Sequence, residues 1–238
     1  MFTESGDVTT TIQTEDVMEP WASAITPDGH VAVTSRKNKK VVLLGRDGRV
    51  RGSFGEGDLA CPSGIAVTRA GDIVVTDFQT GRVLVYDSSG ALVTDLGAGR
   101  GVTFHQPRYV TVSRHGDVII SDSGNHRLAI FDKDWNFVAS AGTFGKKDGC
   151  LKFPHAVCTD DHGNILVCDR YNDRVSVFTR RGDFLRHLVT SAHKLRHPQG
   201  LALSPGMELY VSHGGLKAHT IMVFSLNVFT GSEVTAAD

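Results

Sequence analysis

The feature that most constrains this 238-residue chain is an internal repeat of 40-odd residues. Self-similarity at such a period is typical of solenoids and propellers. The stretch "VIISDSGNHRLAIFD" at 118–132 resembles both 73–87 and 165–179: an apolar run, an acid, a short loop, an Arg and a second apolar run. The repeats stand 42, 45, 47 and 44 residues apart, and each begins at a proline: Pro20, Pro62, Pro107, Pro154 and Pro198.

Each repeat reads as four short strands. In the second repeat we expect strands at 64–67, 72–77, 82–87 and 91–96, rich in β-branched residues and separated by glycine turns. No helical periodicity of ten residues competes anywhere. Four-stranded units of this length are typical of propeller blades, so we predict an all-β propeller of five blades. Six blades are the alternative, which is less favoured because no sixth proline-to-glycine unit is visible.

The turn glycine is the most regular signal after the prolines. A glycine follows each of the first four prolines by nine residues, and Met207 holds that place in the fifth repeat. The fifth repeat also shows only three clear strands, whereas "VTTTIQ" at 8–13 alternates like a spare strand. We therefore predict that this N-terminal strand completes the last blade and closes the ring. The chain would divide into a tail with closing strand at 1–17, a propeller at 18–226 and a tail at 227–238.

The third repeat carries a family resemblance. "DSGNHRLAIFD" at 122–132, with Asn125, His126 and Leu128, resembles the NHL repeat, and the resemblance extends over 18–226. NHL propellers form the C-terminal recognition domain of many tripartite-motif proteins, which begin with a RING ubiquitin-ligase domain and B-boxes. The resemblance implies a recognition module of a RING-type E3 ubiquitin ligase that recruits RNA or a substrate protein. The zinc modules of that family are not in this sequence.

Charge is unevenly divided between the two faces of such a propeller. The net charge is only −1, so no global field draws the chain to nucleic acid or membrane. The loops from fourth to first strand and from second to third strand open on one face, here called the first face. By our assignment that face holds 16 Lys and Arg against 8 Asp and Glu. We therefore predict one basic face on a molecule that is neutral overall.

Asp and Arg recur at one loop position of three repeats. The pairs are Asp77 with Arg82, Asp122 with Arg127, and Asp169 with Arg174. A ligand site rarely needs three copies, whereas a scaffold does. We therefore assign them a structural role, with Asp accepting backbone N–H groups and Arg bridging to a carboxylate or carbonyl.

The residue after each repeat proline varies instead of repeating, which suggests that this position reads a ligand. Arg and aromatic side chains interleaved on a basic rim suit stacked bases and phosphates, and they equally suit a protein hot spot. We favour single-stranded RNA, with a substrate protein as the alternative. The predicted ligand-binding residues are Trp21, Arg36, Lys37, Phe78, Gln79, Arg108, Tyr109, His155, Arg170, Tyr171, Arg196 and Gln199.

We expect no catalytic residues, metal or cofactor in this domain, because no nucleophile motif or phosphate-binding loop occurs. A metal-dependent lactonase- or lyase-like propeller is a remote alternative, with His105, His155 and His197 as conceivable ligands. Two of the four cysteines, Cys158 and Cys168, fall in strand-like runs and are expected in the core. With no signal peptide or apolar run of membrane length, we expect a cytoplasmic, monomeric domain without membrane contact.

Overall fold

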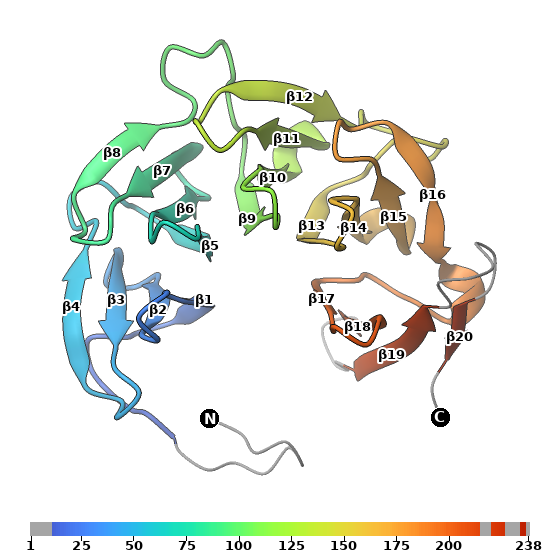
Figure 1. The fold of residues 1–238 in the computed structure, drawn as a ribbon. Coiled ribbons are helices and arrows are strands. Elements are labelled where there is room, and N and C mark those ends of the chain that lie inside the picture. The colour runs from blue at the N-terminus through green and yellow to red at the C-terminus, as the bar shows by residue number, and fades with distance from the viewer. Residues whose placement is uncertain (1–10, 215–219, 227–233, 237–238) are drawn as a thin grey trace.

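The computed structural model describes residues 11–214, 220–226 and 234–236, and these residues form five four-stranded antiparallel sheets around a common centre (Figure 1). The first sheet is β1 (Pro20–Ile25), β2 (Val31–Ser35), β3 (Lys40–Leu44) and β4 (Val50–Phe54). The second is β5 (Pro62–Val67), β6 (Ile73–Asp77), β7 (Arg82–Tyr86) and β8 (Leu92–Asp95). The third is β9 (Pro107–Val112), β10 (Val118–Asp122), β11 (Arg127–Phe131) and β12 (Phe137–Ala141).

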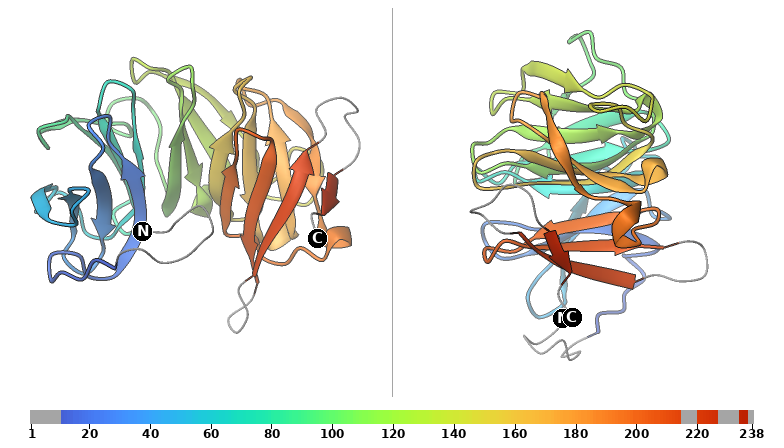
Figure 2. Two further views of the ribbon diagram at one scale, coloured as in Figure 1. Left: turned by 60° about the horizontal axis from the view of Figure 1, so that its bottom comes forward. Right: turned by 90° about the vertical axis from the view of Figure 1, so that its right-hand side faces the viewer.

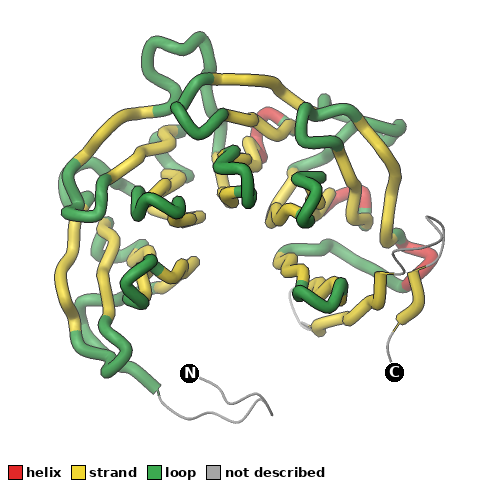
Figure 3. Tube along the Cα trace, viewed as in Figure 1, coloured by secondary structure: helices red, strands yellow, loops and turns green. Residues whose placement is uncertain are grey.

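The last two sheets repeat the pattern. The fourth is β13 (Pro154–Thr159), β14 (Ile165–Asp169), β15 (Arg174–Phe178) and β16 (Phe184–Val189). The fifth is β17 (Gly200–Leu203), β18 (Glu208–His213), β19 (Thr220–Leu226) and β20 (Val234–Ala236). Three short 3₁₀ turns, η1 (Ser123–Asn125), η2 (Arg170–Asn172) and η3 (Ser191–His193), lie in the loops between strands (Figure 3). The prediction of an all-β propeller with five blades is confirmed.

The turn between the first and second strand of each blade explains the repeated glycine. Gly29, Gly71, Gly116 and Gly163 have φ between +83° and +97°, where a side chain is disfavoured. Met207, which replaces glycine in the fifth blade, takes the same left-handed region with φ +61°. The repeated glycine therefore marks a turn position where the backbone must be left-handed. In the fifth blade Met207 adopts this conformation at a cost in conformational energy.

Figure 2 shows the blades side by side in chain order. Four layers of apolar side chains join them, one between each neighbouring pair. Between the second and third blades, for example, Val74 and Val85 pack against Ile120 and Phe131, and all four side chains are fully buried. Burying one such side chain contributes about 1.5–3 kcal/mol. Cys168 is fully buried and Cys158 packs beside it, as expected, and all four cysteines are free thiols. The layers hold the inner strands β1, β5, β9, β13 and β17 in order.

The ring does not close among the described residues. Contacts join each inner strand to the next, but no comparable contact joins β17 back to β1, and Figure 1 shows the first and fifth blades on either side of a gap. Ala24 and Met222 pack toward the neighbouring blades, so the alternating Ile25 and Ile221 face the other way. These two isoleucines are 72% and 68% exposed. The five blades form an open arc.

The predicted closure by the N-terminal strand is wrong. The fourth strand of the last blade is β20, which pairs with β19 through Phe224, Ser225 and Leu226 and lies within the segment assigned above to a C-terminal tail. Of the proposed closing strand, residues 8–10 lie outside the described residues, and 11–13 form no strand. Ile12 packs instead on the first blade, where alternation along β2 and β3 turns an apolar face away from the second blade.

That first-blade contact gives a direct test of the correction. Ile12 and Val17 cover Val33, Val42 and Leu44. Removing residues 1–13 takes away Ile12, so we expect a loss of about 1–3 kcal/mol of stability from its lost burial. Hydrogen exchange should then show weaker protection in β2 and β3, with β18 and β19 unchanged. Loss of protection in β19 instead would support the prediction that the N-terminal strand completes the last blade.

Candidate functional site

The first face is built on one hydrogen bond that recurs in all five blades. In each blade, the donor is the backbone N–H two residues before the repeat proline. The acceptor is the side chain fifteen residues after that proline, at the end of the second strand. The five bonds are Met18 N to Ser35 Oγ at 2.9 Å, Ala60 N to Asp77 Oδ2 at 2.6 Å, His105 N to Asp122 Oδ1 at 2.8 Å, Lys152 N to Asp169 Oδ1 at 2.7 Å and Arg196 N to His213 Nδ1 at 3.3 Å. For the fifth blade, the proline counted is Pro198.

The Asp–Arg pairs form as expected in the third and fourth blades. Arg127 Nε donates to fully buried Asp122 and Arg174 Nε to fully buried Asp169, each at 2.8 Å. Both arginines also donate to carbonyls of the preceding inter-blade loop, such as that of Thr103 for Arg127. Burial raises the pKa of the Asp169 carboxyl, against the hydrogen bonds that favour its charged form. These two pairs clamp the inter-blade loop to the blade.

The second blade departs from the pattern. Asp77 accepts four backbone N–H groups, from Ala60, Cys61, Gln79 and Thr80. A carboxylate has about four lone-pair sites, so the backbone leaves no place for an arginine. Arg82 pairs with Asp95 at 2.8 Å instead. The structural role assigned to both residues holds, but the predicted pairing of Asp77 with Arg82 is wrong.

The remaining cations of the face divide into paired and unpaired groups. Arg196 pairs with Asp173 at 3.1 Å and Lys40 with Asp16 at 3.3 Å. By contrast, Arg36, Arg108 and Arg170 form no ion pair within the described part of the chain. Charge available to a ligand therefore comes from these three arginines and from the exposed lysines, of which Lys37 is one.

Each of the three unpaired arginines lies over an aromatic ring. Arg36 stands 4.7 Å from the Trp21 ring centre, Arg108 stands 4.5 Å from Phe78, and Arg170 stands 5.4 Å from Tyr171. Such contacts are worth about 0.5–1 kcal/mol at exposed sites. Rings rather than carboxylates hold these guanidinium groups, so their charge is not cancelled.

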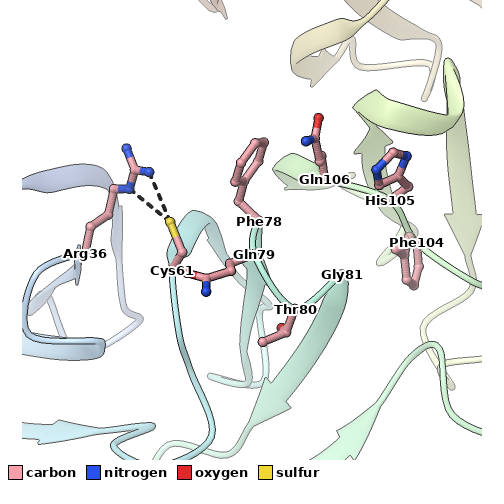
Figure 4. A pocket seen from close by; sticks show the side chains of 9 residues that line it. All are labelled: Arg36, Cys61, Phe78, Gln79, Thr80, Gly81, Phe104, His105 and Gln106. Carbon is pink, nitrogen blue, oxygen red and sulfur yellow. Dashed lines mark hydrogen bonds between the residues drawn. The ribbon is translucent and has the colours of Figure 1, made fainter.

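A pocket of about 420 Å³ opens beside Phe78 on the first face (Figure 4). It lies between the β6–β7 loop and the loops before β5 and β9. At its side, Arg36 donates from Nε and Nη2 to the Cys61 sulfur at 3.2 and 3.0 Å. The lining residues are Arg36, Cys61, Phe78, Gln79, Thr80, Gly81, Phe104, His105 and Gln106. Rings, amides and a cation together suit a planar polar group.

An aromatic row crosses the third, fourth and fifth blades on the same face. Phe144, His126, Phe153, Tyr171 and His197 follow one another with ring centres 4.4–5.5 Å apart. Phe144 at its end is 65% exposed. Lys152 lies 5.9 Å from the Phe144 ring centre, so the row carries cations at its edge as well.

Two of the predicted ligand-binding residues lie beneath the rim instead of on it. His155 is only 3% exposed, and burial together with Arg108 and Arg170 lowers its pKa to about 3. Tyr109 packs into the layers between the later blades, and burial raises its pKa. Gln199 is half-buried and fixed by its backbone to Ala156 and Ser212. The other nine predicted residues lie in the loops or strand starts of the first face.

Sequence reasoning missed the ring-bearing residues just before the prolines. Phe153 precedes Pro154, and Phe104 precedes Pro107 by three residues, so neither stands at the variable position after the proline. Phe153 and Gln106 have φ near +50°, a left-handed conformation in which the side chain leaves the strand direction. The sequence signal that was missed is the residue directly before the proline, which is left-handed and is aromatic in Phe153 and polar in Gln106.

The structure gives no support to the metal alternative in the residues it describes. No group of three His, Cys, Asp or Glu side chains there could hold a metal ion. His105 lies in the pocket, His155 is buried beside Arg170, and His197 stacks on Tyr171, so the three do not converge. Within the same residues, no helix has the length and apolarity needed to cross a membrane.

Three of the five blades match the NHL repeat, over residues 59–86, 104–131 and 151–178. No curated protein matches the chain. Among solved structures, virginiamycin B lyase from Staphylococcus aureus superposes with a TM-score of 0.75 at 12% identity, over 99% of this chain and 75% of that one. A chain of a nidogen–laminin complex superposes with a TM-score of 0.72 at 17% identity, over 95% and 82%. The fold is thus a β-propeller with NHL repeats; at these identities the structural neighbours show the fold alone.

The buried clamp can be tested at Asp122. We expect Asp122→Asn to lower the free energy of unfolding by about 2–3 kcal/mol, because the loop loses a charged acceptor for three donors. Thermal melting measures this loss. Asp134→Asn, at an exposed acid whose carboxylate accepts from Lys133, is the matched control and should change little. If Asp122→Asn melted at the wild-type temperature, the structural role assigned to Asp122 would be wrong.

Proposed function

We propose that this NHL-repeat propeller is a ligand-recognition module that binds single-stranded RNA through its first face. One observation carries the proposal: Arg36, Arg108 and Arg170 stack on aromatic rings and have no carboxylate partner among the described residues. Single strands are bound by rings that stack on bases and by cations that follow the backbone. The first face offers both within neighbouring blades.

The spacing of the rings supports RNA further. Arg170 lies over Tyr171 of the aromatic row, and Arg108 lies over Phe78 beside the pocket, so each arginine adjoins one group of rings. An extended strand could therefore stack bases at two places while its phosphates pass the arginines. The amides of Gln79 and Gln106 in the pocket can donate to and accept from a base edge.

A substrate protein is the second candidate, and the exposed rings favour it. Phe144, Tyr171 and Trp21 are all exposed aromatic residues, the type that dominates protein hot spots. A protein bound through them would bury apolar area and respond weakly to salt. Salt dependence thus separates the two candidates.

We place this module in a cytoplasmic RING-type tripartite-motif E3 ubiquitin ligase, where ubiquitin transfer would belong to segments other than the propeller. The resemblance of 122–132 to the NHL motif and the three matched blades support this setting. The propeller itself is proposed to bind without cofactor or catalysis, as a monomer. A lyase among the structural neighbours does not argue otherwise, because a shared fold does not carry chemistry. The mass of the endogenous protein tests whether zinc modules accompany the propeller.

Salt titration of labelled single-stranded RNA tests the proposal. We expect the logarithm of affinity to fall linearly with the logarithm of salt concentration, with a slope of about −2 to −4, because each phosphate contact of a single strand adds about −0.7. Arg36→Glu and Arg170→Glu should each weaken binding strongly and flatten the slope, since each removes a contact.

The control variants lie on the opposite face. Arg69 and Arg181 are exposed there without a described ion pair, so Arg69→Glu and Arg181→Glu should leave RNA binding unchanged. Arg180 is unsuitable because it pairs with buried Asp117, and its loss would disturb the fold. If no RNA binds even at low salt, the face belongs to a protein partner.

A further inference from the structure

We infer that the centre of the first face is a binding site for one phosphate group, formed by Arg108, Arg170 and His155. The inference deepens the proposed function and rests on the same face, because it names the group that this face would hold at its centre. Free inorganic phosphate tests it without any RNA.

The three side chains come from the innermost parts of two neighbouring blades. Arg108 is the second residue of β9, His155 is the second residue of β13, and Arg170 begins η2 directly after β14. Arg170 Nη1 lies 3.3 Å from His155 Nε2. Inner strands surround the centre of the arc (Figure 1), so strand starts on the first face lie at the central opening.

The cluster lacks hydrogen-bond acceptors for three of its buried N–H donors. Arginine only donates, so His155 Nε2 must accept from Arg170, and the neutral imidazole then carries its proton on Nδ1. That Nδ1 is buried without a partner, and so are Nε of Arg108 and Nε of Arg170. Three neighbouring side chains thus each carry a buried N–H donor with no acceptor among the described groups. Unpaired buried donors are rare in native proteins and costly.

The charges of the cluster are equally unbalanced. Burial lowers the pKa of Arg108, and the positive charges of Arg170 and Arg36 lower it further. The same two causes, burial and the charges of Arg108 and Arg170, hold His155 neutral. No carboxylate is among the groups that act on either residue. A cluster of like charges that no described acid offsets destabilises the free protein, and a bound anion would relieve it.

A phosphate group fits these donors better than a carboxylate does. Its oxygens accept several charge-assisted hydrogen bonds at once, and guanidinium groups bind it in a forked geometry. Arg108 also lies over Phe78, which lines the pocket of about 420 Å³. A phosphate held at the centre would therefore leave space beside it for the group to which it is esterified.

Calorimetric titration with inorganic phosphate tests the site. We expect saturable binding of one phosphate, and a loss of affinity of at least about tenfold in both Arg108→Gln and Arg170→Gln, since each removes a charged donor. Arg69→Gln, on the opposite face, should bind as the wild type does. Phosphate should also raise the melting temperature of the wild type but not that of either variant.

A second readout separates binding from a merely structural role. Without phosphate, Arg108→Gln should melt at or above the wild-type temperature, because it removes a half-buried like charge. Lower melting of both variants, with phosphate affinity unchanged, would overturn the inference. So would an equal response to acetate at the same ionic strength, or no saturation up to about 10 mM phosphate.

The result also stays distinct from the test of RNA binding. If RNA binds and phosphate does not, the proposed function stands and the central site is rejected. If phosphate binds and RNA does not, the site stands and the proposed function fails. Tighter binding of a 5′-mononucleotide than of phosphate would support both the site and a nucleotide source, whereas equal binding supports the site with free phosphate.

Discussion

The structure depends on one hydrogen bond, made five times, from a loop N–H to a side chain at the end of a second strand. The acceptors are Ser35, Asp77, Asp122, Asp169 and His213. Because the donor stands two residues before the proline of the inner strand, the bond fixes where that strand begins. It thereby fixes the residue after the proline, which is Arg108 in the third blade and His155 in the fourth. Scaffold and site are set by the same contact.

The division of arginines follows from this scaffold. Arg127 and Arg174 reach the buried acids and are consumed in holding loops together. Arg36, Arg108 and Arg170 form no ion pair among the described residues and lie over aromatic rings. Arg36 also donates to the Cys61 sulfur, and Arg170 also contacts His155. Net charge per face is therefore a poor guide to binding, whereas the presence or absence of a carboxylate partner shows which charges a ligand can use.

Local patterns in the sequence predicted local structure well. Alternation and glycine turns gave the strands, and the repeated Asp was correctly read as a loop anchor. The partner of Arg82 was missed because four backbone donors fill Asp77, which depends on the loop path. The closing strand was misplaced because Ile12 fits any apolar face, and only the arrangement of blades shows that it covers the first. Likewise, the aromatic row was not predicted, because its rings come from blades that are distant in sequence.

The most direct test of the account is to map where a ligand touches the molecule. Ultraviolet crosslinking of single-stranded RNA, followed by mass spectrometry, would identify the attached residues. We expect adducts at rings of the first face, such as Phe78, Tyr171 and Phe144, and none at Tyr210, an exposed ring of the fifth blade that faces the gap. Adducts confined to Tyr210, or spread evenly over both faces, would contradict recognition by the unpaired arginines and their rings.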